Sequence, residues 1–214
     1  MTFSGSAVAD VFAAYEQRNA SERIKATALG KEMFARRDEF LLPVGPEVGW
    51  FLHSLILARR PARVLELGTS YGYSTLFLAD AAHQVGARLI TMELADYKQA
   101  EARANITRAG LAGSVDFRLG DAIKMIEADP GPFDFVLLDI WKELYVPCLD
   151  AFYPKLSAEG IVAADNMIEP VQARDSARAY RAALRTRDDL HTALLPIGQG
   201  IELSVRWPAG STKL

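Results

Sequence analysis

The sequence predicts an α/β protein built on a doubly wound, mostly parallel sheet. From about residue 60 onward, short apolar runs of strand length alternate with amphipathic stretches of helical length. Two of the apolar runs stop abruptly at a carboxylate, Asp139 and Asp165. The chain then closes on two further apolar runs around Gln199-Gly200, which is a hairpin signal. Alternation of this kind indicates a parallel sheet with helices on both faces.

Composition restricts the class of protein further. The 214 residues, half of them hydrophobic and 24% charged, suit one soluble globular domain. The 24 basic and 27 acidic residues leave a net charge of −3, which argues against nucleic acid as a partner. The single cysteine, Cys148, has no partner for an internal disulfide and indicates a reducing, cytoplasmic setting. We find neither an apolar run of the roughly 18–20 residues that a membrane span needs nor a signal peptide.

Residues 1–58 are predicted to form a helical cap that precedes the sheet. Apolar positions at helical spacing indicate one helix over about residues 6–20 and a second over 21–38. Leu42-Pro43-Val44-Gly45-Pro46 breaks the pattern, and a mostly apolar helix is expected over 47–58.

Residues 59–207 are predicted to form the α/β core, and 208–214 a frayed tail. Strands are expected at 63–68, 88–94, 115–120, 133–139 and 160–166, and the hairpin strands at 194–198 and 201–207. Helices are expected near 72–83, 97–109, 122–128, 144–156 and 171–187.

The two acidic strand ends are the first candidate site. Asp139 is followed by Lys142, and Asp165 is followed by Asn166. If the two strands are parallel neighbours, about 4.8 Å apart, these side chains meet at one edge of the sheet. Hard oxygen ligands of this kind suit a divalent cation, with Lys142 nearby as a general base. The alternatives are helix-capping acids without a metal and a solvated surface lysine.

A glycine-containing turn after the first strand is the second candidate site. The segment Glu66-Leu67-Gly68-Thr69-Ser70-Tyr71-Gly72-Tyr73-Ser74 has the spacing G-x-x-x-G, whereas a dinucleotide fingerprint needs G-x-G-x-x-G. The missing glycine and the acidic Glu66 argue against a pyrophosphate and favour a ligand with an amino group and a carboxylate. The alternative is a tight strand-to-helix turn without a ligand.

Acids at the ends of the next two strands are consistent with a nucleoside. Glu93 ends the second strand about 25 residues after the glycine turn, where an acid characteristically binds the two ribose hydroxyls. Asp121 follows the third strand, and either caps a helix or reaches an adenine.

These motifs together resemble the cation-dependent O-methyltransferases that use S-adenosylmethionine, and most of all the catechol O-methyltransferases and their bacterial relatives. The resemblance rests on ELGTSYGYS, TMEL, LGDA, LLDIWKELY, VAADN and LPIGQGIELSVR, which occur in the family's order from about Leu42 to Trp207. It implies the class I methyltransferase fold, a Rossmann-like seven-stranded sheet of order 3-2-1-4-5-7-6 with strand 7 antiparallel. That order makes the fourth and fifth strands neighbours.

The resemblance also implies a role for individual residues. It implies contacts to S-adenosylmethionine from Val44, Glu66, Gly68, Ser70, Tyr73, Ser74, Glu93, Leu94, Asp121, Ala122, Asp139 and Trp141. It implies that Asp139, Asp165 and Asn166 bind Mg²⁺, or another divalent cation such as Mn²⁺ or Ca²⁺, and that Lys142 is the base beside Asp139. Phe40, Trp141, Lys142, Asn166 and Pro170 would surround a small aromatic substrate.

The chain departs from the catechol enzymes at one substrate contact. Their additional glutamate before the last strand aligns with Ala193 here, so the acceptor is expected to be a catechol, a caffeoyl-type molecule or another vicinal dihydroxy aromatic.

The alternatives are a metal-independent methyltransferase, a non-catalytic protein that binds S-adenosylmethionine and, because of the glycine spacing, less readily a nicotinamide dehydrogenase. The N-terminal helices are also compatible with a homodimer. Trp141 as core packing is a further alternative, and His53, His83, His191 and Cys148 are interpreted as structural.

Overall fold

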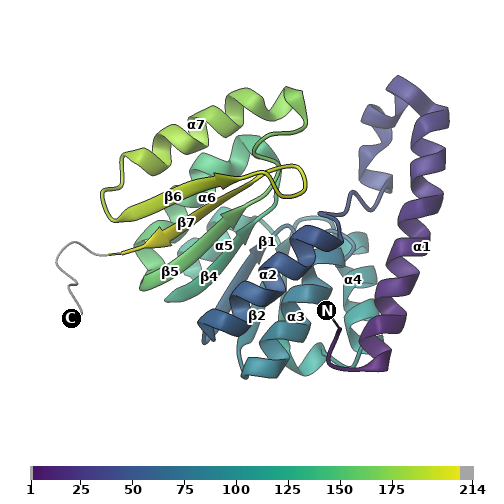
Figure 1. Cartoon of the computed structure of the whole chain (residues 1–214), viewed down its shortest axis with the longest axis horizontal. Coiled ribbons are helices and arrows are strands. Elements are labelled where there is room, and N and C mark those ends of the chain that lie inside the picture. Colours follow the sequence, from purple (N-terminus) through teal and green to yellow (C-terminus); the bar gives the residue numbers. More distant parts are fainter. Residues whose placement is uncertain (1, 208–214) are drawn as a thin grey trace.

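The computed structural model describes residues 2–207, and a seven-stranded sheet lies at the centre of the molecule (Figure 1). The strands are β1 (Arg63–Leu67), β2 (Arg88–Glu93), β3 (Val115–Leu119), β4 (Phe133–Leu138), β5 (Leu156–Ala164), β6 (Leu190–Leu195) and β7 (Ile201–Arg206). Their order is β3-β2-β1-β4-β5-β7-β6. β1 to β5 pair in parallel, whereas β7 is antiparallel to both β5 and β6. The expected strand order, with strand 7 antiparallel, is therefore confirmed.

Helices cover both faces of this sheet because successive strand residues point to opposite faces. Val64 belongs to the apolar cluster on one face and Leu65 to the cluster on the other. The first face is covered by α2 (Pro46–Arg59), α3 (Tyr73–Val85) and α4 (Asp96–Arg108), and the second by α5 (Ala122–Ala128), α6 (Tyr145–Phe152) and α7 (Arg174–Arg185) (Figure 1). None of the helices within residues 2–207 combines the length and apolar character needed to cross a bilayer.

The N-terminal cap differs from the two helices expected. A single helix, α1, spans Ser6–Leu29, and a 3₁₀ helix, η1, spans Gly30–Glu39. The break lies at Gly30, which has a φ of 55° that favours glycine. The apolar spacing at 21–38 was misleading, because Ile24 and Phe34 are exposed. Only the first half of α1 packs on the core, and its second half extends with η1 beyond the sheet (Figure 1).

Three other elements differ at their ends from the sequence expectation. β5 begins earlier, at Leu156, and α6 is a short helix flanked by the 3₁₀ turns η3 (Lys142–Leu144) and η4 (Tyr153–Lys155). The first hairpin strand, expected at 194–198, is β6 at Leu190–Leu195. β6 is an edge strand whose middle residues are exposed, so its sequence lacks the apolar run that marks a buried strand. The expected tail at 208–214 lies outside the described residues.

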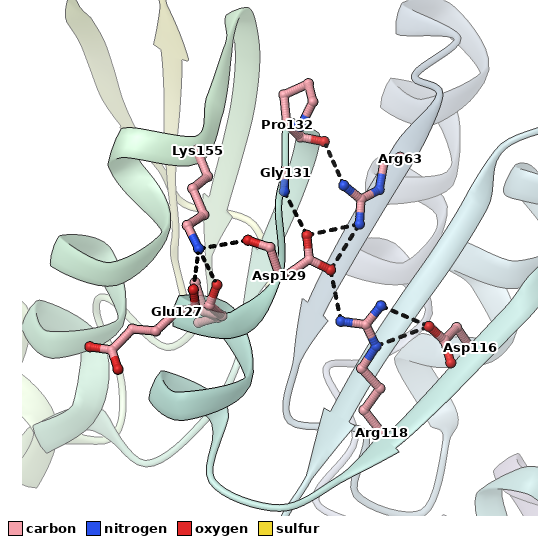
Figure 2. A network of polar contacts seen from close by, with 9 residues as sticks. Arg63, Asp116, Arg118, Glu127, Asp129, Gly131, Pro132 and Lys155 are labelled. Carbon is pink, nitrogen blue, oxygen red and sulfur yellow. Dashed lines mark hydrogen bonds and ion pairs between the residues drawn. The ribbon is translucent and has the colours of Figure 1, made fainter.

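An ion-pair network joins β1 and β3 to the segment that precedes β4 (Figure 2). The Asp129 carboxylate is almost fully buried and pairs with Arg63 at 2.9 Å and with Arg118 at 2.7 Å. Arg118 also pairs with Asp116 at 2.9 Å. Burial alone would raise the pKa of Asp129, but the Gly131 N–H and the two guanidinium groups hold it below its ordinary value. The network therefore links the segment before β4 to β1 and β3.

Replacing Asp129 with Asn is expected to destabilise the protein by about 3 kcal/mol, since it removes the anion that pairs with Arg63 and leaves Arg118 with Asp116 alone. Because the folded-state pKa of Asp129 is lowered, this contribution is present above the ordinary Asp pKa of 3.8 and is lost as the pH falls further. Urea unfolding of both proteins at neutral and acidic pH measures the difference. Asp175→Asn is the control, because Asp175 and its partner Arg178 are both highly exposed and the loss should stay below about 1 kcal/mol. Equal losses in the two variants would contradict the prediction.

Candidate active site

The predicted polar residues meet at the carboxyl edge of the parallel strands. Glu93 ends β2, and Asp121, Asp139 and Asp165 follow β3, β4 and β5. Parallel strands finish at the same edge of a sheet, which is where α/β proteins place their ligands. The fold therefore brings residues far apart in the sequence to one surface.

Asp139 and Asp165 are neighbours because the ladder of the sheet continues past both strands. The Asp139 N–H donates to the Leu67 carbonyl oxygen at 3.0 Å, and the Asp165 N–H donates to the Leu138 carbonyl oxygen at 3.1 Å. Asp165 is only 2% exposed, and its Oδ1 is buried without a hydrogen-bond partner in the described part of the chain. Burial and then the charge of Asp139 raise the pKa of Asp165 to about 7.

A hard cation fits this arrangement. An unpaired buried carboxylate oxygen beside a second carboxylate lacks a positive partner. The described residues contain no group of three or more His, Cys, Asp and Glu side chains placed to bind a metal, so the third protein ligand would be the Asn166 amide. Asn166 has a φ of 57°, a conformation that asparagine tolerates better than most residues. Oxygen ligands of this kind suit Mg²⁺ or Ca²⁺ rather than zinc.

Lys142 lies beside the carboxylates and is held by several contacts. Its Nζ donates to Asp139 Oδ1 at 3.3 Å, to the Ile140 carbonyl oxygen at 3.2 Å and to the Tyr145 hydroxyl at 2.5 Å. The Tyr145 hydroxyl lies 2.9 Å from the Leu138 carbonyl oxygen and 3.0 Å from that of Asp165. Burial, followed by the charges of Asp139 and Asp165, raises the pKa of Tyr145 well above its ordinary value, so the hydroxyl keeps its proton.

The glycine turn approaches other parts of the chain closely. A Cβ on Gly68 would lie 2.0 Å from the Asp139 carbonyl oxygen, and one on Gly72 would lie 2.8 Å from the Tyr15 hydroxyl. Both glycines also have a positive φ, of 100° and 91°. Gly68 thus lets β1 and β4 end side by side, and Gly72 lets α1 pack on the turn. Both glycines therefore have a structural reason that does not depend on a ligand.

Glu66 is fully buried below this turn and accepts hydrogen bonds from hydroxyl groups. Ser74 donates to Oε1, and Thr75 and Thr91 donate to Oε2, each at 2.6 Å. Burial raises the pKa of Glu66 to about 7, although the three hydroxyls act against this rise. The structure therefore places Ser74 and Glu66, both predicted to contact the cofactor, in direct contact with each other.

The acids at the ends of β2 and β3 organise the backbone around them. Glu93 Oε2 accepts from the Ser70 N–H at 2.8 Å, and its Oε1 accepts from the N–H groups of Leu94 and Ala95 at 2.9 and 3.0 Å. Glu93 thereby ties the end of β2 to the glycine turn. Asp121 caps α5, since its Oδ1 accepts from the Lys124 N–H at 3.0 Å. The capping alternative for Asp121 is confirmed, and its contact with an adenine stays a prediction.

The side chains of the other predicted residues point in different directions. The Tyr73 hydroxyl donates to Glu16 at 2.7 Å, so this side chain packs on α1 and is not brought to the carboxylates. Phe40 is buried and lines a pocket of about 340 Å³ between α1 and η1. Trp141 is 41% exposed, which excludes the core-packing alternative, and the Arg37 guanidinium lies 4.2 Å from its ring centroid. Val44 lies in the connection before α2, and Pro170 directly precedes the 3₁₀ turn η5 (Val171–Ala173).

The sequence reasoning missed two residues beside the predicted ones. Tyr145 contacts Lys142, and its position one helical turn further along the chain was the only signal available. Gln199 accepts a hydrogen bond from Asn166 Nδ2 at 3.0 Å. Only the pairing of the hairpin with β5 brings Gln199 there.

The chain belongs to the O-methyltransferase family, whose model matches residues 18–207. It is 39% identical over 132 residues to a protein named catechol O-methyltransferase from Niastella koreensis, and the match covers 59% of each chain. A probable O-methyltransferase from Mycobacterium tuberculosis is 33% identical over 170 residues, which cover 74% of this chain and 70% of that protein.

Comparison with solved structures shows the fold. An O-methyltransferase from Streptomyces achromogenes that is involved in tomaymycin synthesis, solved in complex with SAM, superimposes with a TM-score of 0.73. The match covers 90% of this chain and 98% of that one at 24% identity. The class I methyltransferase fold expected from the sequence is therefore confirmed.

Replacing Glu66 with Gln is expected to change the pH dependence of stability. The pKa of Glu66 is raised from 4.5 to about 7 in the folded state. Its contribution to stability is therefore fully present below pH 4.5 and is lost as the pH rises through 7. Between pH 4.5 and pH 7, the free energy of unfolding of the variant should therefore rise by roughly 3 kcal/mol relative to that of the wild type.

Urea unfolding at pH 5 and pH 8 measures this change, with Glu127→Gln as the control because residue 127 is exposed. A stability difference between the wild type and the Glu66 variant that is the same at both pH values would show that the prediction is wrong.

Proposed function

We propose that this protein transfers the methyl group of S-adenosylmethionine to one hydroxyl of a vicinal dihydroxy aromatic molecule, with the help of Mg²⁺ or a similar cation. The observation that carries the proposal is the unpaired, buried Oδ1 of Asp165 beside Asp139, with Lys142 hydrogen-bonded to the latter. Membership in the O-methyltransferase family supports the reaction class.

Asp139, Asp165 and Asn166 are the residues that would hold the cation. A cation held there would supply positive charge that favours the ionised form of a substrate hydroxyl. The two carboxylates balance a dication, and the burial of Asp165 strengthens that interaction, since water screens it little. The amide of Asn166 contributes an oxygen without a further charge.

Lys142 would accept the proton of the reacting hydroxyl. A phenol has an ordinary pKa near 10 and is a poor nucleophile at neutral pH, so removal of its proton speeds the reaction. The Ile140 carbonyl oxygen, Asp139 and Tyr145 hold the amine at a defined position.

The glycine turn and Glu93 would hold the methyl donor. S-adenosylmethionine supplies a methyl group on a positively charged sulfur, together with an amino acid end and a ribose. Glu93 lies at the strand end where acids bind ribose hydroxyls, and the start of α3 after Gly72 favours a carboxylate. The Streptomyces structure, which was solved in complex with SAM, supports S-adenosylmethionine as the donor.

The acceptor would lie beside Lys142, between Trp141 and the segment that contains Asn166 and Pro170. The relative named catechol O-methyltransferase supports a vicinal dihydroxy aromatic. Because Ala193 stands where the catechol enzymes have a glutamate that contacts the substrate, we propose vicinal dihydroxy aromatics in general as acceptors rather than catechol alone. The homodimer and the cytoplasmic location stay predictions.

Removal of divalent cations is expected to abolish methyl transfer and addition of Mg²⁺ to restore it. The assay measures transfer of a labelled methyl group from S-adenosylmethionine to catechol, caffeate and a flavonoid, with EDTA and with Mg²⁺. Calorimetry with S-adenosylmethionine in EDTA serves as the control, because the proposed donor site does not include the cation. Full turnover in EDTA would contradict the proposal and favour a metal-independent methyltransferase.

Replacing Lys142 with Met is expected to lower kcat by about 10²–10⁴-fold, the range for loss of a general base. The affinity for S-adenosylmethionine should change little, because Lys142 is not among the residues that are predicted to contact the cofactor. Lys124→Met, on the exposed face of α5, is the matched control and should retain wild-type rates. A Lys142 variant that is as active as this control would show that another group takes the proton.

A further inference from the structure

The last two residues of the loop between β6 and β7, Gln199 and Gly200, are hydrogen-bonded to the segment that follows Asp165. The Met167 N–H donates to the Gly200 carbonyl oxygen at 3.0 Å. The N–H groups of Ile168 and Glu169 donate to the Gln199 carbonyl oxygen at 2.9 and 3.0 Å. The backbone of Gln199 is therefore fixed relative to the end of β5.

Close packing at two glycines holds this loop in place. Gly200 has a φ of 96°, and a Cβ there would lie 2.5 Å from Ile168 Cγ1. A Cβ on Gly198 would lie 2.5 Å from Val48 Cγ2 on α2. The loop is therefore clamped between α2 and residues 167–169, and the Gln199 side chain starts from a rigid base.

From this base the Gln199 side chain reaches Asn166. Asn166 Nδ2 donates to Gln199 Oε1 at 3.0 Å. Once the nitrogen of a primary amide is engaged in this way, its carbonyl oxygen is the atom left for other contacts. A metal cation binds an amide only through its oxygen. The hydrogen bond to Gln199 therefore selects the orientation of the Asn166 amide that suits a metal ligand.

We propose that Gln199 is a positioning residue, which holds the Asn166 amide with Oδ1 toward the divalent cation. This inference rests on the proposed function, because it assumes that Asn166 binds the cation. Partners that hold a metal ligand by its other atom commonly raise metal affinity. Gln199 does so without charge, and therefore adds no third negative group beside Asp139 and Asp165, which already repel each other.

The test measures binding of Mn²⁺ alone, by electron paramagnetic resonance of the free ion, to the full chain. Gln199→Met keeps the length of the side chain but removes the acceptor, and should weaken Mn²⁺ binding by about tenfold. Gln199→Glu keeps an acceptor for Asn166 Nδ2 and should bind Mn²⁺ at least as tightly as the wild type. Gln172→Met is the control, because Gln172 is exposed and its side chain makes no hydrogen bond within residues 2–207. Both Gln199 variants should unfold at the wild-type temperature, since the backbone contacts of the loop remain.

Each possible result of the Mn²⁺ binding experiment either supports the positioning role of Gln199 or contradicts it. A wild-type protein that does not bind Mn²⁺ overturns the proposed metal site, and the inference falls with it. A wild-type protein that binds Mn²⁺ while Gln199→Met binds it equally well overturns the inference alone. Equal loss of binding in the Met and Glu variants, or an equal loss in Gln172→Met, indicates a general disturbance of the loop and also overturns it. Weaker binding in Gln199→Met alone supports the positioning role.

Discussion

The parallel pairing of β1, β4 and β5 is the constraint on which the rest of this structure depends. Leu138 pairs with Ala164, so the residues that follow them, Asp139 and Asp165, are adjacent whatever their side chains prefer. Two carboxylates repel each other and would separate in a free chain, but the free energy of forming the whole sheet keeps them together. Lys142 and the Tyr145 hydroxyl are arranged around this enforced contact.

A comparison of two of the buried carboxylates, Glu66 and Asp165, separates an acid whose oxygens are paired within the protein from a candidate metal ligand. Burial raises the pKa of Glu66 and of Asp165 alike to about 7. Glu66 is surrounded by hydroxyl donors, which satisfy both of its oxygens. Asp165 has a buried oxygen without a donor and a second carboxylate beside it. Buried polar atoms in proteins are nearly always paired, and this exception lies at the edge where α/β proteins bind their ligands.

The N-terminal cap contributes directly to the surroundings of the site. The Asp38 carbonyl oxygen accepts from the Tyr71 hydroxyl at 2.8 Å, and the Asp38 carboxylate pairs with Lys98 at 2.7 Å. These contacts hold η1 beside the glycine turn and place Arg37 over the exposed face of Trp141. The cap and the loop after β4 therefore enclose the edge from one side, while the β6–β7 loop borders it near Asn166.

The sequence by itself determined the α/β class, the positions of the parallel strands and the acids at their ends. Those features follow from patterns of apolar and acidic residues that are close together in the sequence, and such patterns can be read without the structure. The family resemblance supplied the strand order, and the tertiary structure decided what the patterns left open. It directed Tyr73 toward α1 and brought Gln199 to Asn166. These results depend on contacts between residues distant in the sequence, and such contacts leave no periodic signal in the chain.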